Sequence, residues 1–303
     1  MDDKIPLLVI AGPTASGKTS LAIDLAIERN GEIISADSMQ IYSGMEIATA
    51  KPSIEEMRGI PHHLLGIVEP NVRFSVAQYA PLAHAAIQDI YARGKLPILC
   101  GGTGLYIQAV TENLQLTEGE IAHSTAGTWN DLYEIDPIAA AKIHPNDQKR
   151  ISHALALYCA TGVTLTEQNL RSRVVPSSYD ACMIVLNARE RQHLYERIDR
   201  RVDRMLAMGL LEEAKNQRQQ AVATAAQAIG YKELEPYFLG QCSLEEAVEC
   251  LKRETRRYAK RQLSWLRRMA REWNERVPGS CVEFFIEDEN LLEQAIEYAR
   301  RTP

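Results

Sequence analysis

Residues 12–19 read Gly-Pro-Thr-Ala-Ser-Gly-Lys-Thr, and this stretch decides the fold. It follows an apolar run, Ile5 to Ala11, and precedes a segment, 21–26, with the apolar spacing of a helix. A strand, a glycine-rich turn and a helix in this order, with the spacing Gly-x-x-x-x-Gly-Lys-Thr, are typical of a phosphate-binding loop. Small residues let successive backbone N–H groups turn inward, and the start of the helix adds partial positive charge. We predict that a diphosphate or polyphosphate binds to Gly12, Pro13, Thr14, Ala15, Ser16, Gly17, Lys18 and Thr19, whose last hydroxyl can reach a bound Mg²⁺.

The elements around the loop indicate an α/β fold with a parallel, doubly wound sheet. Strands are predicted at 5–11, 32–35, 96–100, 181–187 and 281–286. The first part of the chain alternates strands with helices, and a Ser75-x-x-Gln78 capping box opens one of these helices. In such a sheet the ligand lies at the carboxyl ends of the strands, which is where the phosphate loop stands.

Residues 112–173 interrupt this alternation. They are polar at first and then show helical patterns at 128–133, 137–143 and 147–161. We interpret 112–173 as a small helical insertion domain that contacts a polyanion, within a phosphate-loop core made of 1–111 and 174–303. A solvated helix face is the more ordinary explanation for the basic side chains of the insertion.

Composition defines the broad class of protein. The chain has 303 residues, of which 46% are apolar and 24% charged, as in ordinary soluble globular proteins. No apolar run approaches the roughly 20 residues of a membrane span, and the first residues show no basic region or cleavage site of a signal peptide. The six cysteines form no Cys-x-x-Cys pair. We expect a cytoplasmic protein, monomeric and without a membrane partner.

Two turns beside the phosphate loop carry candidate catalytic groups. Asp37 follows the strand 32–35, so its carboxylate should face the same crevice, although a turn-capping role is equally common for Asp at such a place. Thr103 stands in a glycine cluster after the strand 96–100, where the backbone can approach a ligand. The pair His62-His63 suggests a metal site, but adjacent residues cannot both face one ion, so a structural role is favoured.

The charge of the chain is unevenly distributed. A net charge of −6 argues against a uniformly basic nucleic-acid binder. Between Lys252 and Arg271, however, there are nine Lys and Arg and one acidic residue, and a local patch of this kind can bind nucleic acid. A neutral-to-apolar stripe on the same predicted helix, 243–269, favours a core position. A second basic helix, 193–208, carries Arg197 and Arg201 on one face, which suits a diphosphate or RNA as well as it suits pairing with neighbouring aspartates.

Three functions fit these residues. A small-molecule or nucleotide kinase using ATP usually carries an Asp at the end of an apolar strand to hold Mg²⁺, but the strand 96–100 ends in Cys-Gly-Gly. Asp37 is then free to act as a base, and a transferase with diphosphate as leaving group and a nucleic-acid acceptor fits. A non-catalytic RNA-binding protein gated by nucleotide is the third. The residues alone do not separate the three.

Beyond these patterns, the chain resembles the tRNA dimethylallyltransferases over nearly its whole length. The resemblance lies in the phosphate loop together with Ser-Ala-Asp-Ser at 35–38 followed by Gln40 and Tyr42, Thr49-Ala-Lys-Pro52, Pro61-His-His-Leu64, Gly101-Gly-Thr-Gly-Leu-Tyr106, Arg197-Ile-Asp-Arg-Arg-Val-Asp-Arg-Met205, Ala228-Ile-Gly-Tyr-Lys-Glu233 and Arg257-Tyr-Ala-Lys-Arg-Gln-Leu263. The loop alone is shared with many unrelated enzymes, whereas the set in this order is specific.

The resemblance implies a nucleotide-kinase-like core and transfer of a dimethylallyl group from dimethylallyl diphosphate to the exocyclic amine of the tRNA adenosine just 3′ of the anticodon. It implies that the prenyl diphosphate, with Mg²⁺ at Thr19, and the flipped base of the tRNA anticodon stem-loop enter one channel from opposite sides. The catalytic residues it implies are Asp37 as base, with Lys18, Arg197 and Thr103. The tRNA contacts it implies are Asp37, Ser38, Met39, Gln40, Thr103, Gln148, Arg150, Lys260, Arg261 and Gln262.

The chain departs from the family's pattern on the expected tRNA side. The family commonly has Arg at the position of Met39, often a second Arg at Ser43, an Arg at His153 and a Glu at Ala156, whereas Arg150 is kept. The insertion is shorter than usual in its first half, and the absence of a C-terminal zinc-finger extension resembles the bacterial form. These departures affect expected tRNA affinity and leave the expected catalytic set intact.

Overall fold

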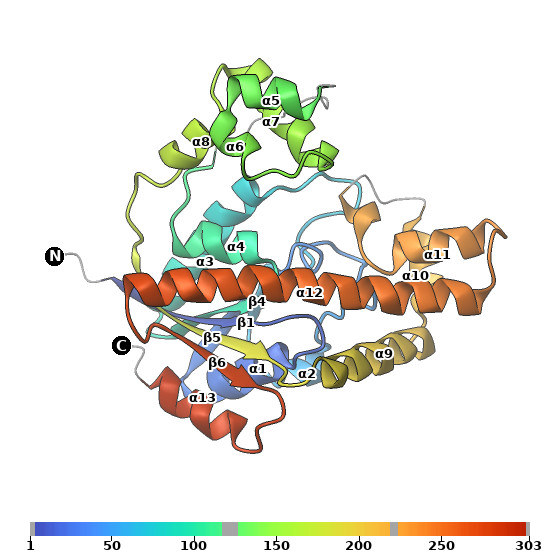
Figure 1. Ribbon diagram of the computed structural model, residues 1–303. Helices are drawn as coiled ribbons and strands as arrows, with labels where there is room; N and C mark the ends of the chain where they lie inside the picture. Colours follow the sequence, from blue (N-terminus) through green and yellow to red (C-terminus); the bar gives the residue numbers. More distant parts are fainter. Residues whose placement is uncertain (1–3, 117–126, 219–223, 301–303) are drawn as a thin grey trace. The chain divides into compact units, whose positions relative to one another are not determined.

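The computed structural model describes residues 4–116, 127–218 and 224–300 (Figure 1). It forms two compact units, one made of Met1–Thr111 and Ser178–Pro303 and the other of Glu112–Ser177. Among the described residues, no helix is both long and apolar enough to cross a membrane.

The first unit is built on a parallel sheet with the strand order β3-β2-β4-β1-β5-β6. The strands are β1 (Ile5–Ala11), β2 (Gly31–Ser35), β3 (His62–His63), β4 (Leu96–Gly101), β5 (Tyr179–Asn187) and β6 (Cys281–Phe285). The predicted α/β fold with a parallel sheet is confirmed. Ala11 at the end of β1 lies opposite Gly101 at the end of β4, so the turns that follow these strands are neighbours. Strands β2, β3 and β4 lie on one side of β1, and the later strands β5 and β6 lie on the other. The place where the strand order changes direction is a topological switch point, and α/β sheets bind ligands there.

Alternate side chains of β1 face two separate helical layers. Leu8 and Ile10 share a core with α1 (Lys18–Glu28) and α13 (Leu291–Ala299). Leu7 and Val9 share the other core with α3 (Val76–Ala92), α4 (Gly104–Thr111) and α12 (Leu244–Arg276). Burial on both faces explains why the central strands appear in the sequence as continuous apolar runs.

The long helix α12 is tied to α9 (Arg191–Ala207) by two ion pairs. Lys252 Nζ lies 2.7 Å from Asp203 Oδ1, and Arg256 Nη1 lies 2.6 Å from Asp199 Oδ1. Two members of the predicted basic patch therefore hold helices together. The helix extends past its predicted end at residue 269 because Trp273 continues the buried stripe. Shorter helices complete this unit, namely α2 (Ile54–Met57), α10 (Leu210–Gln217), the 3₁₀ turn Ala225–Gln227 and α11 (Tyr231–Phe238).

The edge strand β3 was not predicted. It pairs with β2, His62 lying opposite Ile33 and His63 opposite Ile34. A strand of two residues among prolines and glycines is too short to show any periodicity, so its sequence carried no signal.

The second unit is helical. Its helices are α5 (Trp129–Ile135), α6 (Pro137–Ala140), α7 (Gln148–Thr161) and α8 (Leu165–Arg171). They enclose a small core to which Leu132, Ile151 and Leu155 contribute. Helix α8 was missed, although a capping box, in which Thr164 and Glu167 satisfy each other's backbone N–H groups, opens it.

Candidate active site

The phosphate loop joins β1 to α1 as predicted. Gly17 has a φ of +88°, in the left-handed region that glycine adopts freely, and Ala15 also lies there. At Gly12 a Cβ atom would lie 2.6 Å from Ser16 Oγ and 3.1 Å from Leu186 Cβ, so a larger residue does not fit. The Ser16 hydroxyl is buried and has no hydrogen-bond partner among the described residues. A buried hydroxyl normally has a partner, and a phosphate oxygen in the loop would supply one.

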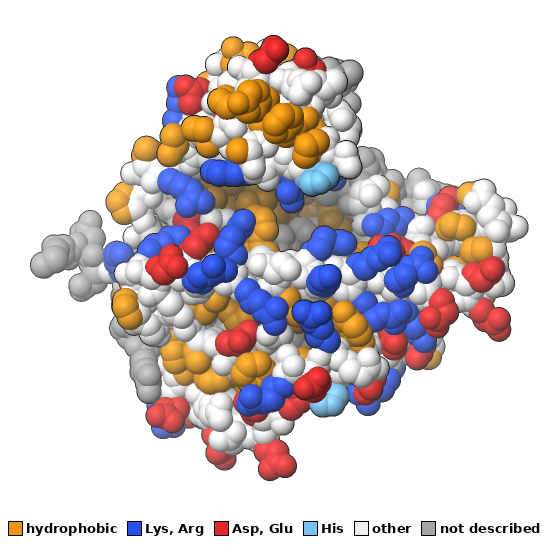
Figure 2. Space-filling model, viewed as in Figure 1, with side chains coloured by type: hydrophobic (Ala, Val, Ile, Leu, Met, Phe, Trp, Pro, Cys, Tyr) orange, Lys and Arg blue, Asp and Glu red, His pale blue; other side chains and the backbone are white. Residues whose placement is uncertain are grey.

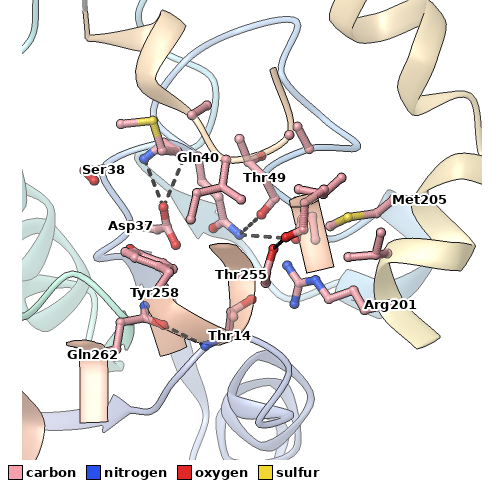
Figure 3. Close-up of a pocket in the computed structure, with 18 of the residues that line it drawn as sticks. Thr14, Asp37, Ser38, Gln40, Thr49, Arg201, Met205, Thr255, Tyr258 and Gln262 are labelled. Atoms are coloured by element: carbon pink, nitrogen blue, oxygen red, sulfur yellow. Dashed lines mark hydrogen bonds between the residues drawn. The ribbon is translucent and has the colours of Figure 1, made fainter. Parts of the chain in front are cut away.

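Gln262 of α12 joins this loop to the turn after β4 (Figure 3). Its Oε1 accepts a hydrogen bond from Thr14 N at 2.9 Å. Its Nε2 donates to Gly102 O at 3.0 Å. A Cβ atom on Gly102 would lie 2.2 Å from Nε2, so only glycine leaves room for this contact. The resemblance implies that Gln262 contacts tRNA. In the structure both ends of its amide are engaged within the protein, where they fix the loop.

Two cationic side chains lie beside the loop. Lys18 and Arg201 line the same pocket, and Figure 3 shows Arg201 reaching into it from α9. Burial, and then the neighbouring Arg201, lower the pKa of Lys18. Burial also lowers the pKa of Arg201, and the carboxylate of Asp37 acts in the opposite direction. Cations that are buried and repel each other form a site that an anion stabilises.

Arg197, one turn before Arg201, contacts the backbone of the loop. Its Nε donates to Ala15 O at 2.8 Å, and its Nη2 would lie 3.3 Å from a Cβ atom on Gly17. Of the two arginines, Arg201 lines the pocket in the described structure, and Arg197 does not. The sequence places both arginines on one face, and the resemblance implies a catalytic role for Arg197. In the structure Arg197 contacts the backbone of the loop, and Arg201 lines the pocket.

Asp37 follows β2 and faces the same pocket, as predicted. Its Oδ1 accepts hydrogen bonds from Met39 N at 2.9 Å and from Gln40 N at 3.4 Å, so the turn-capping role is present. The described residues give Oδ2 no hydrogen bond, which leaves this oxygen able to accept a proton. The Thr103 hydroxyl supports the turn by accepting a hydrogen bond from Ser38 N at 3.0 Å. Thr103 thus acts on the position of Asp37.

The pocket has a volume of about 230 Å³ and joins a polar wall to an apolar one. The apolar wall is made of Ala48, Val202, Met205, Leu210, Ala228, Ile229 and Leu251. On the α12 side stands Tyr258, whose pKa is raised by burial and whose ring lies 5.7 Å from the Arg261 guanidinium carbon. The segment 228–233, which showed little intrinsic chemistry in the sequence, supplies part of the wall.

Glu213 of α10 holds another wall in place. Its carboxylate accepts hydrogen bonds from three consecutive backbone N–H groups, those of residues 46–48, at 2.7 to 2.8 Å. Gln40 continues this support, because its Nε2 donates to the carbonyl oxygens of Thr49 and Ala50, each at 3.2 Å. No pattern in the sequence indicates this role of Glu213, because nothing local shows that a helical Glu reaches a loop so distant along the chain.

The side chains expected to contact RNA belong to both units. Lys260 and Arg261 are exposed on α12, and Figure 2 shows Lys and Arg side chains gathered along this helix. In the second unit, Gln148 Nε2 donates to Gly127 O at 2.7 Å, and Arg150 is exposed on α7. In the first unit, the basic face of α12 is therefore the surface that suits a phosphate backbone.

The residues present fit a magnesium ion that arrives with a diphosphate. The described part of the chain contains no cluster of three or more His, Cys, Asp or Glu that would hold a metal alone. Thr19 nevertheless lines the pocket together with Lys18 and offers a hydroxyl oxygen. Mg²⁺ keeps several waters and is commonly held by one or two protein oxygens and by substrate phosphates, which is the donor set available here.

These features define a class: a phosphate-loop α/β protein in which one pocket joins an anion site to a carboxylate and an apolar wall. The family model for IPP transferase matches residues 40–269, and that for isopentenyl transferase matches residues 5–66. The chain belongs to the IPP transferase family.

Relatives of known name agree with this assignment. A tRNA dimethylallyltransferase of Caldanaerobacter subterraneus is 45% identical, over 97% of this chain and 97% of its own, and one of Anoxybacillus flavithermus is 47% identical, over 93% and 94%. Among solved structures, the tRNA isopentenylpyrophosphate transferase of Bacillus halodurans is 39% identical with a TM-score of 0.69, over 98% of this chain and 95% of its own. A eukaryotic dimethylallyltransferase acting on tRNA is 31% identical with a TM-score of 0.80, over 98% of this chain and 80% of its own.

Proposed function

We propose that this protein transfers the dimethylallyl group of dimethylallyl diphosphate to the N6 amine of the tRNA adenosine immediately 3′ of the anticodon. The products are N6-(dimethylallyl)adenosine and diphosphate. The observation that carries the proposal is the single pocket in which Lys18 and Arg201 lie beside the phosphate loop and share the space with the carboxylate of Asp37. The names of the relatives, tRNA dimethylallyltransferases, support the choice of donor and acceptor.

The reaction forms a bond between adenine N6 and C1 of the dimethylallyl group while the bond from C1 to the diphosphate oxygen breaks. The N6 lone pair is delocalised into the ring, so the amine is a poor nucleophile until a base accepts its proton. Asp37 Oδ2 is the atom we assign to this proton, because Oδ1 is held by the turn.

The electron pair of the breaking bond goes to the diphosphate. Its growing charge meets Lys18, Arg201 and the N–H groups of the phosphate loop, which are already in place before the reaction starts. Mg²⁺, held by Thr19 and phosphate oxygens, would neutralise part of the same charge. These groups stabilise the transition state more than the bound donor.

The apolar wall of the pocket suits the hydrocarbon part of the donor. Val202, Met205 and Leu251 lie on it. Burial of such a group contributes roughly 0.8 kcal/mol per CH₂, so a five-carbon chain adds appreciably to affinity.

The end of β4 favours prenyl transfer over phosphoryl transfer. In kinases with a phosphate loop an Asp at a strand end commonly serves the metal. Here Cys100 is followed by Gly101 and Gly102, and burial raises the pKa of the Cys100 thiol to about 12, so it carries no charge at neutral pH.

The basic face of α12 supports an RNA acceptor. An adenosine must leave its stack to reach the pocket, at a cost of a few kcal/mol, and contacts of Lys260 and Arg261 to phosphates would offset this cost. Arg261 lines the pocket as well, so it stands between the RNA surface and the reacting groups.

The test is prenyl transfer followed by mass spectrometry of the RNA. The protein is incubated with Mg²⁺, dimethylallyl diphosphate and an anticodon stem-loop with adenosine 3′ of the anticodon; an otherwise identical RNA with guanosine there is the control. We expect the mass of one dimethylallyl group on the first RNA alone. Asp37→Asn keeps the side-chain shape and should lower turnover by about 10²- to 10⁴-fold with RNA binding unchanged. Absence of the mass gain in the wild-type protein would refute the proposal, and near-normal turnover in Asp37→Asn would remove Asp37 from the mechanism.

A further inference from the structure

The two adjacent histidines of β3 have different surroundings. His63 Nε2 lies 2.8 Å from Glu32 Oε2, and Lys95 lies 2.7 Å from the other oxygen of the same buried carboxylate, so His63 belongs to an ion-pair cluster. His62 Nδ1 lies 2.8 Å from Ile60 O. A carbonyl oxygen only accepts, so Nδ1 carries the ring proton and Nε2 is left as an acceptor. This buried Nε2 has no hydrogen-bond partner among the described residues.

His62 also lines a second, smaller cavity that it shares with active-site groups. The cavity has a volume of about 20 Å³, and its polar lining includes Lys18, Thr19, Asp37 and Gln40. A site that holds a water needs roughly 10–15 Å³ and two to four polar partners, so this cavity accommodates one water molecule. The cavity therefore connects His62 Nε2 to Thr19, which we assign to the metal, and to Asp37, which we assign to the proton.

We propose that His62 is a positioning residue for Thr19 and Asp37 and that it acts through one buried water. The water donates one hydrogen bond to His62 Nε2 and the other to the carboxylate of Asp37, and it accepts one from the hydroxyl of Thr19. A hydroxyl that gives its proton to this water turns its lone pairs toward the diphosphate side, where a magnesium ion needs them. The inference rests on the proposed function and adds to it a residue that tunes how the metal binds.

The chemistry of the site agrees with this role. Burial lowers the pKa of His62, so its ring is neutral at physiological pH and keeps the lone pair on Nε2. Partners one step behind a metal ligand fix that ligand's orientation, and their loss typically costs 10- to 100-fold in metal affinity. The two histidines thus have different roles. His63 stabilises the edge of the sheet through Glu32, and His62 lines the cavity beside Thr19 and Asp37.

The experiment measures binding of dimethylallyl diphosphate by isothermal titration calorimetry at a series of Mg²⁺ concentrations without RNA, so that no transfer occurs. His62→Phe keeps a ring and removes the acceptor. We expect the Mg²⁺ concentration for half-maximal binding to rise about 10-fold. His62→Gln restores an acceptor near the position of Nε2 and should return this concentration most of the way to the wild-type value. His63→Gln is the matched control; it should lower Tm and leave the Mg²⁺ dependence unchanged.

An unchanged Mg²⁺ dependence in His62→Phe would overturn the proposal, and so would an equal shift in His63→Gln. If His62→Phe does not fold, the comparison moves to His62→Gln and His62→Asn. Both keep a polar amide, but only the longer Gln reaches the cavity, so the proposal requires a lower Mg²⁺ requirement for Gln, and equal values overturn it. Because binding alone is measured, a wild-type protein that binds the donor yet modifies no RNA refutes the proposed function without affecting this comparison.

Discussion

Replacing Gln262 by methionine should loosen the phosphate loop while the helix that carries it stays folded. Methionine has a similar length and a high helix propensity, so α12 and its packing are kept. The change removes the hydrogen bonds to Thr14 N and Gly102 O. Each contributes about 1 kcal/mol net, so the phosphate-bound protein should lose about 2 kcal/mol relative to the unfolded chain.

The lost free energy is shared between the free energy of unfolding and the free energy of donor binding. If the free loop stays ordered without Gln262, the whole loss appears in unfolding, and Tm falls by about 3 °C for a chain of 303 residues. If the free loop relaxes and must be ordered again by the donor, the loss appears in binding, and about 2 kcal/mol is roughly 30-fold in Kd. The sum of the two losses is the quantity that the structure determines.

Urea denaturation and calorimetric titration with dimethylallyl diphosphate at fixed Mg²⁺ measure the two parts. Ser264→Ala, on the exposed side of the same helix, is the control, since its hydroxyl donates to Lys260 O of its own helix. Gln262→Glu keeps the acceptor for Thr14 N and places a carboxylate oxygen against Gly102 O, so it should lose more than Gln262→Met. A summed loss within about 0.5 kcal/mol of zero for Gln262→Met, the range of ordinary surface changes, would refute this role of the side chain.

Two further predictions concern charged groups. Arg201→Met should lower kcat/KM by about 10²-fold or more, and Arg197→Met should lower it less, because Arg197 contacts Ala15 O instead of lining the pocket; equal losses would contradict this division. Arg93 above all, then Lys95 and His63, hold the pKa of the buried Glu32 well below its ordinary value of 4.5, although burial acts in the opposite direction. The stability that this shift confers is complete above pH 4.5 and is lost as pH falls toward the lower, folded-state pKa. From neutral to acid pH, the free energy of unfolding should therefore fall more steeply for the wild type than for Glu32→Gln. If the two free energies fall in parallel, this linkage is excluded.

The features that could be predicted from the sequence are those with a local cause. The phosphate loop follows from the spacing of residues 12–19, and α3 follows from the capping box at Ser75, whose partner is three residues away. Strands β1 and β4 follow from apolar runs that both faces of the sheet bury. In each case the residues that determine the structure are neighbours in the chain, so their pattern is visible before folding.

The features that were missed depend on partners that folding brings from far along the chain. Gln262 joins two turns that are remote from it in sequence, and Glu213 caps a loop more than one hundred residues before it. Arg197 and Arg201 are equivalent in the helical pattern, and only the packing of α9 against the loop distinguishes the residue that contacts the loop from the residue at the pocket.

The sequence left two interpretations of Asp37 open, a turn cap and a catalytic base, and one carboxylate can serve both. Met39 N donates to Oδ1, which caps the turn, whereas the proposed reaction assigns the proton to Oδ2. Thr103 holds the next residue of the turn, so the carboxylate cannot rotate to exchange its oxygens without breaking these contacts. In the proposed reaction the same turn orients Asp37 as the base, so Thr103→Val should lower kcat more than it raises the KM for either substrate.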